Sequence, residues 1–161
     1  MNQNAQSKEQ GAALVEFALI LPILILFVFA IVDFGRYFFI QHTLQYATRE
    51  GMRLALVGGT ITREEELLDR TDSMRTIIRE KVSLAINPDD LQINVFEVNP
   101  DFSDPDSWDE ASDAGGPDSI MRVRTRYNLN FITPIIGSFF PDDGILVQVQ
   151  GTYRNEFFDN N

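Results

Sequence analysis

The chain has 161 residues, with 24 acidic side chains against 13 basic ones and a formal net charge of -11. This charge excludes nucleic acid as an expected partner, because a nucleic-acid-binding protein presents a basic face that neutralises phosphates. The chain contains no cysteine. A disulfide framework and a thiolate metal site are therefore excluded as well.

The first part of the chain divides into a polar leader and a long apolar segment. The leader covers residues 1–11, and the segment that follows, residues 12–32, carries a single charged side chain, Glu16. As a helix this segment is about 31 Å long, which matches the roughly 30 Å hydrocarbon core of a bilayer. The chain beyond Gly58 is too short to enclose an all-round apolar helix in a core of its own. We therefore expect one membrane span in contact with membrane lipid.

A removed secretory signal peptide is the alternative interpretation of this segment. Two features oppose it: the apolar run is longer than the roughly 7 to 15 residues of a signal core, and no clear A-x-A cleavage site follows it. Charge bias does not fix the orientation of the span, because Lys8 lies on one side and Arg36 on the other. The sequence favours a membrane anchor over a signal peptide.

Two features within and after the apolar segment shape the helix. Pro22 removes the hydrogen-bond donor for the carbonyl of Ala18, so we expect a bend there that a membrane helix tolerates. Asp33 and Arg36 are the first charges after the segment. At a spacing of i and i+3 they mark the membrane exit and can pair with each other.

Glu16 is the charge that needs a partner, because an ionised side chain is disfavoured inside an apolar membrane helix. A cut after Gly11 makes Ala12 a positively charged amino terminus, and the ammonium of one subunit can then meet Glu16 of its neighbour. At a separation of about 4 Å the attraction is comparable with the cost of burying the charge. Such pairing sets register as well as association. The alternative is that the glutamate side chain reaches the membrane interface by itself.

Several short motifs occur together between Gly11 and Ala55. They are the glycine itself, the triplet V-E-F at residues 15–17, the proline in the apolar run, D-F-G-R at residues 33–36 and A-T-R-E-G-M-R at residues 47–53. This combination resembles the TadE-like pseudopilins of the tight-adherence pilus machinery, also called the Flp or type IVc pilus. The rest of the chain resembles them only loosely, through T-P-I at residues 133–135 and Y-R-N-E at residues 153–156.

The resemblance implies a minor pilin or pseudopilin that a membrane prepilin peptidase cuts between Gly11 and Ala12. It also implies that a cytoplasmic ATPase and the inner-membrane pilus assembly platform act on the subunit, and that Glu16 recruits it to other pilins. The implied location is the bacterial inner membrane, with a cytoplasmic N-terminus and a periplasmic or extracellular head. The subunit then either enters the fibre or primes its assembly.

Catalysis finds no support in the residues. The chain has one histidine, His42, no cysteine, and no glycine-rich phosphate loop after a predicted strand. We therefore expect a protein that is not an enzyme and that uses no cofactor or metal. The alternative function, from a different class, is an uncleaved single-span scaffold or binding protein with an extracytoplasmic head.

The fold class that we predict is α+β and type IV pilin-like, with a long N-terminal helix and a small head of one helix on an antiparallel sheet. The helix continues beyond the membrane over residues 33–58 and ends at Gly58 and Gly59. The head is residues 59–161. The packing face of the extramembrane helix is predicted by an apolar stripe with spacings near three and four: Phe34, Tyr37, Phe38, Leu44, Gly51 and Ala55.

A second helix is predicted from a capping box. Thr62 with Glu65 three residues later indicates its start, and Asn87 with Pro88 indicates its end. One narrow apolar face indicates that this helix lies on the sheet or on the first helix, outside the membrane. The face consists of Leu67, Thr71, Met74, Ile78, Val82 and Ala85.

Alternating apolar residues predict three strands, near residues 91–95, 121–131 and 145–153. The middle strand places Arg122, Arg124 and Arg126 on one stripe. We expect this stripe to be a solvated face of the sheet. The alternative is that the arginines pair with the nearby acidic loop or with an acidic neighbouring subunit.

Two connecting segments complete the head. Residues 99–119 carry seven acidic side chains and no basic one, which favours a flexible acidic loop. Calcium is the alternative, but the D-x-D at residues 104–106 lacks the glycine and the distal glutamate of an EF-hand. Residues 133–141 are apolar and interrupted by proline and glycine, so they cannot form a long helix. We expect them to tuck under the sheet, with an exposed contact patch as the alternative.

Overall fold

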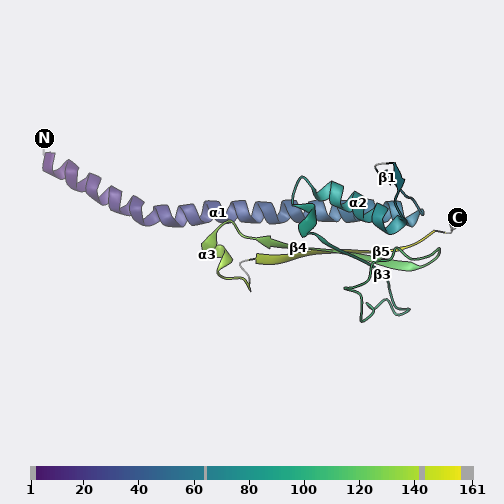
Figure 1. The fold of residues 1–161 in the computed structure, drawn as a ribbon. Coiled ribbons are helices and arrows are strands. Elements are labelled where there is room, and N and C mark those ends of the chain that lie inside the picture. Colours follow the sequence, from purple (N-terminus) through teal and green to yellow (C-terminus); the bar gives the residue numbers. More distant parts are fainter. Residues whose placement is uncertain (1–2, 64, 142–143, 157–161) are drawn as a thin grey trace.

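A computed structural model describes residues 3–63, 65–141 and 144–156 of the chain. Its longest element is the helix α1 (Gln3–Leu56), which runs along the head and projects far beyond it at the N-terminal end (Figure 1). The head combines a helix with antiparallel strands, so the predicted α+β class is confirmed. The projecting part of α1 curves away from the axis of the rest (Figure 1).

The end of α1 lies where the two glycines predict it. Gly58 has a φ of 69°, a left-handed conformation that favours glycine. Its N–H donates to the carbonyl of Ala55 at 3.0 Å, and the N–H of Gly59 donates to the carbonyl of Leu54 at 3.0 Å. These bonds satisfy carbonyls that the last helical turn leaves without a donor.

The segment that follows corrects the predicted start of the second helix. Thr62 lies in β1 (Thr62–Arg63), which pairs antiparallel with β2 (Glu66–Leu67) in a small hairpin. Glu65 forms the turn with a φ of 70°, which no residue in the first turn of an α-helix can have. The apparent capping box is therefore part of a hairpin.

The second helix, α2 (Arg70–Val82), begins seven residues later than predicted, because its cap is Asp69 and not Thr62. The side chain of Asp69 accepts a hydrogen bond from the backbone N–H of Asp72 at 2.7 Å. The helix also ends earlier, at Val82, and Asn87 instead caps the short 3-10 helix η1 (Pro88–Asp90). The predicted apolar face is correct at its centre, since Met74, Ile78 and Val82 are all fully buried.

Gly51 sets how closely α1 and α2 approach. A Cβ atom built at Gly51 would lie 2.6 Å from Cγ1 of Ile78 and 3.1 Å from Cγ of Met74. Real Cβ atoms do not come that near another carbon, so the two helices can approach this closely only because residue 51 has no side chain. A glycine in the middle of a helix therefore has a packing reason here.

The sheet lies on one side of this helix pair (Figure 1). Its strands are β3 (Gln92–Glu97), β4 (Ile120–Asn130) and β5 (Gly144–Arg154), in the order β3-β4-β5 and antiparallel throughout. The three predicted strands are confirmed within a few residues. α1 packs on β4 and β5, and the buried hydroxyls of Thr48 and Thr125 lie 3.1 Å apart at this contact. The largest fully buried apolar side chains of the core are Leu44, Met74, Ile78, Met121, Leu129, Val82, Val95 and Val123.

The other face of the sheet is covered, which corrects the prediction of a solvated arginine stripe. Arg124 is only 7% exposed, and its Nη2 atom donates to Oδ2 of Asp104 at 2.7 Å. Arg122 pairs with the other oxygen of the same carboxylate. The indole of Trp108 lies over both Arg124 and Arg126, with guanidinium carbons 4.2 and 4.6 Å from its centroid. The acidic loop is therefore held against the sheet, as in the alternative that the sequence left open.

Candidate functional site

The predicted processing and pairing residues lie together near the start of α1. Gly11, Ala12 and Glu16 are in unbroken helix, and all three are exposed. Ala12 and Glu16 are four residues apart, so they lie on one face of the helix about one turn from each other. Among the side chains that the structure describes, no cation is within ion-pair distance of Glu16.

The apolar half of α1 is not covered by the head. The helix Gly11–Leu56 is long and apolar enough to cross a membrane, and its most apolar stretch is not buried by the head. This surface is free to contact lipid or other apolar helices along its length. Its large exposed side chains include Leu14, Val15, Phe17, Leu19, Ile20, Ile23, Leu24, Phe27, Val28, Ile31 and Val32.

Asp33 lies at the junction of the apolar helix and the head, and it is buried instead of exposed to water. Only 2% of the residue is accessible. Its Oδ1 atom accepts a hydrogen bond from the backbone N–H of Ile132 at 2.9 Å, and its Oδ2 atom accepts one from the N–H of Thr133 at 3.2 Å. The predicted partner is Arg36. Its Nη1 atom lies 3.9 Å from Oδ1 of Asp33 and donates to the carbonyl of Asn130 at 3.3 Å. The two charges of the predicted exit thus attach the end of β4 to α1.

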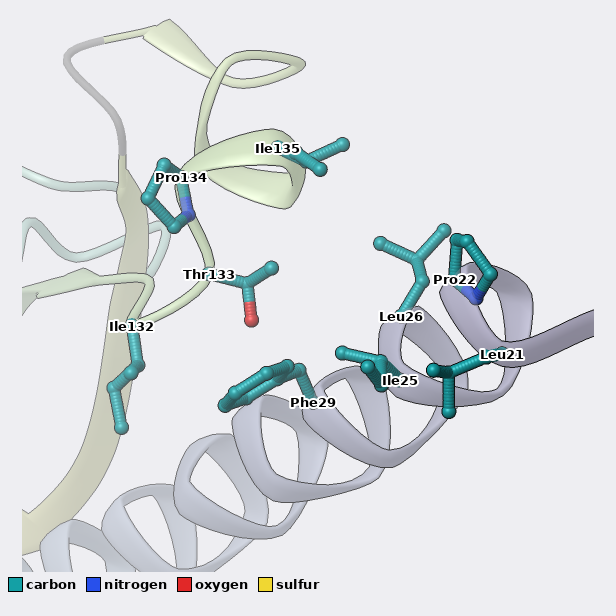
Figure 2. A pocket seen from close by; sticks show the side chains of 9 residues that line it. All are labelled: Leu21, Pro22, Ile25, Leu26, Phe29, Ile132, Thr133, Pro134 and Ile135. Carbon is teal, nitrogen blue, oxygen red and sulfur yellow. The ribbon is translucent and has the colours of Figure 1, made fainter. Parts of the chain in front are cut away.

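The segment after β4 forms an apolar groove with α1. The prediction that this segment tucks under the sheet is therefore wrong. Its short helix α3 (Pro134–Gly137) stands beside the apolar half of α1 (Figure 1). Ile135 and Phe139 are 61% and 81% exposed, so the segment is an exposed apolar patch, as the alternative interpretation expects. Figure 2 shows the groove, a pocket of about 510 Å³ between the two elements. Its lining is Leu21, Pro22, Ile25, Leu26, Phe29, Ile132, Thr133, Pro134 and Ile135.

Other candidate residues do not assemble into a chemical site. His42 is exposed on α1, and among the described residues no three histidine, aspartate or glutamate side chains are grouped to hold a metal ion. Asp104, the acidic residue considered for calcium, is engaged by Arg122 and Arg124. The pKa of its carboxyl is lowered, because although burial raises it, the hydrogen bonds from the two arginines outweigh that effect.

Together, a long apolar helix and a small α+β head on its second half make up the architecture of the chain. Residues 11–53 match the family model described as TadE-like protein. The chain therefore carries a TadE-like helix, as its motifs indicate. No curated protein and no solved structure matches the chain.

The match ends at residue 53 and so covers the apolar segment and most of the part of α1 that follows it. It includes Gly11, Glu16, Pro22 and Asp33 but not the groove-forming residues after β4. The motif in the sequence that marked these residues is the T-P-I turn at residues 133–135. The motif alone does not show which element the turn contacts. The geometry of the head is what places this turn beside Asp33.

Proposed function

We propose that this protein is a minor pilin or pseudopilin of a tight-adherence (Flp, type IVc) pilus. The observation that carries the proposal is a TadE-like helix whose apolar half is uncovered and bears one carboxylate, Glu16. Lateral packing of such helices assembles a pilin fibre, and a helix already buried in its own head is not available for it. The head of this chain leaves that surface free.

In this proposal a prepilin peptidase cuts between Gly11 and Ala12, and the new ammonium meets Glu16 of a neighbouring pilin. Three features support it: the glycine is exposed, no side chain of the head crowds it, and the glutamate has no described cation beside it. Four residues separate the new terminus from Glu16 of the same chain, and helical side chains point toward the N-terminus. In a lone subunit the terminal ammonium can therefore pair with Glu16 of the same chain, until the ammonium of a neighbouring subunit takes its place.

The proposed location is the inner membrane, with the N-terminus in the cytoplasm and the head outside. In that arrangement residues 12–32 span the lipid and a cytoplasmic ATPase with the assembly platform moves the subunit. The size of the head favours a minor subunit, since the major Flp-type pilins implied by the resemblance are little more than the helix. A tip or priming role suits one subunit that adds a folded head to a fibre of helices.

The amino terminus of the protein tests this function. Intact-mass and N-terminal peptide spectra are taken from membranes of cells with and without the prepilin peptidase. The proposal predicts Ala12 as the first residue only when the peptidase is present, and an intact leader when Gly11 is replaced by a bulky residue. An intact leader in peptidase-containing cells that assemble the pilus would instead support the uncleaved membrane-anchored scaffold.

A further inference from the structure

The segment from Ile132 to Phe140, here called the apolar loop, has an exposed surface unlike the rest of the head. It contains no charged residue. Ile132, Ile135 and Phe139 expose 52%, 61% and 81% of their surface, and the loop stands beside the apolar half of α1 (Figure 1). A cluster of exposed large apolar side chains on a small head indicates a contact with another apolar phase or partner.

We propose that the apolar loop is a second membrane contact, which enters the outer leaflet beside α1 so that lipid acyl chains fill the groove between them. Depth is the first argument. The α1 side of the groove is Leu21, Pro22, Ile25, Leu26 and Phe29, all inside the segment that is long enough to span the bilayer (Figure 2). Whatever medium surrounds those side chains also surrounds the loop that faces them.

The polar groups of the loop form the second argument. Lipid cannot satisfy a backbone N–H group, so a segment that enters it must satisfy its own. The N–H groups of Ile132 and Thr133 donate to Asp33, and those from Gly137 to Phe140 donate to carbonyls within the loop. The hydroxyl of Ser138 donates to the carbonyl of Ile135 at 2.8 Å. Six backbone N–H groups of the loop are thus satisfied within the protein, whereas the buried hydroxyl of Thr133 has no hydrogen-bond partner among the described residues.

The attachment of the loop forms the third argument. Asp33 binds its first two residues to α1 directly after the apolar segment, which holds the loop at the level of the span. The apolar surface of the loop and that of α1 are continuous across the groove. A head held by one span alone is free to tilt, whereas two contacts define its orientation on the membrane surface. This inference rests on the membrane span and not on the proposed pilin function.

Single-cysteine labelling tests the proposal without a background, because the chain has no cysteine of its own. The full-length protein is reconstituted in phosphatidylcholine vesicles with an environment-sensitive fluorophore at F139C or at I135C. The matched control is L84C, since Leu84 is a 92% exposed apolar side chain after α2 and does not line the groove. Quenching is measured with nitroxide-labelled lipid and, separately, with aqueous iodide.

The proposal predicts that the labels at positions 135 and 139 emit at shorter wavelength than the label at 84. It predicts lipid quenching several-fold stronger, and iodide quenching several-fold weaker, than at 84. Equal quenching at all three positions would overturn the proposal. Protection from iodide without quenching by lipid would also overturn it, and would assign the groove to a second copy of the chain. Prepilin cleavage does not enter this measurement, so its result is separate from the test of function.

Discussion

The carboxylate of Asp33 accepts a hydrogen bond from the backbone N–H of Ile132, 99 residues later in the chain. A second bond from the next residue, Thr133, occupies the other carboxylate oxygen. These bonds connect the segment just after β4 to the point where the apolar helix leaves the proposed membrane. Asp33 therefore attaches the start of the apolar loop to α1 and determines where that loop lies.

Replacing Asp33 with alanine should release this attachment. A part-buried and a buried N–H group lose a charged acceptor, so we expect the free energy of unfolding to fall by about 1.5 to 3 kcal/mol. The measurement is denaturant unfolding in detergent micelles, followed by the fluorescence of Trp108. Asp106→Ala is the control, because Asp106 is exposed. Equal stability of the two variants would contradict the role given to Asp33.

The contact of α1 with α2 gives a second prediction. Gly51→Ala places a methyl group 2.6 Å from Ile78 Cγ1, so we expect a loss of about 1 to 3 kcal/mol in unfolding free energy. Gly35→Ala in the same helix is the control, since nothing lies within 4 Å of its Cβ position. That variant should be neutral or stabilised, because alanine has the higher helix propensity. Combining Gly51→Ala with Ile78→Ala should recover part of the loss attributed to the clash, and full additivity of the two effects would contradict it.

The helix and strands followed from local patterns, but the contacts between distant parts did not. Hydropathy placed the apolar half of α1, and Gly58 placed its end, because both depend on neighbouring residues only. Thr62 and Glu65 satisfy the spacing of a capping box, yet Asp69 competes with them and begins α2. A local pattern does not reveal which of two possible caps the folded head uses.

The candidate site shows the same division. The sequence identified Gly11, Glu16 and Asp33 from motifs, since each belongs to the TadE-like segment. It left the pairing of the arginines with the acidic loop as an alternative and did not place the T-P-I turn beside Asp33, because both contacts join residues far apart in the chain. Composition indicates that acidic and basic groups are present, whereas the fold decides which of them meet.

Low pH should weaken the attachment of the acidic loop to the arginines of β4. Burial raises the pKa of Asp104, but the hydrogen bonds from Arg124 and Arg122 lower it by more than burial raises it. The pKa of Asp104 in the folded protein therefore lies below its ordinary value of 3.8. The unfolded chain therefore binds the proton more readily. The stabilisation is complete above the unfolded pKa and is lost as the pH falls through the folded one.

This pH dependence is measured as unfolding free energy between about pH 6 and pH 2. Asp104→Asn should lower the stability at neutral pH by about 1 to 2 kcal/mol, because two guanidinium groups lose their counter-charge. It should also make the decline toward acid shallower than in the unchanged protein. Curves of the same shape for both proteins would show that Asp104 is not the titrating group.

Glu16→Gln keeps the size of the side chain but removes its charge. We expect the variant to insert in the membrane as well as the unchanged protein, since the polar group it leaves is neutral. Its association with other pilins should fall about tenfold or more, because the ion pair is lost. Quantitative co-purification from detergent extracts measures this, with Glu66→Gln on the exposed hairpin as the control. Undiminished co-purification would contradict the pairing mechanism.

The most direct test of the central claim is to trap the ion pair as a covalent bond. A membrane-permeant carbodiimide joins a carboxylate to an amine that touches it, and peptide mass spectrometry identifies both partners. A bond within one chain gives a cyclic peptide, which separates it from a bond between chains. The account predicts an amide between Glu16 of this protein and the terminal amine of a neighbouring pilin, absent from Glu16→Gln. A fully assembled pilus in which no such amide forms would contradict it.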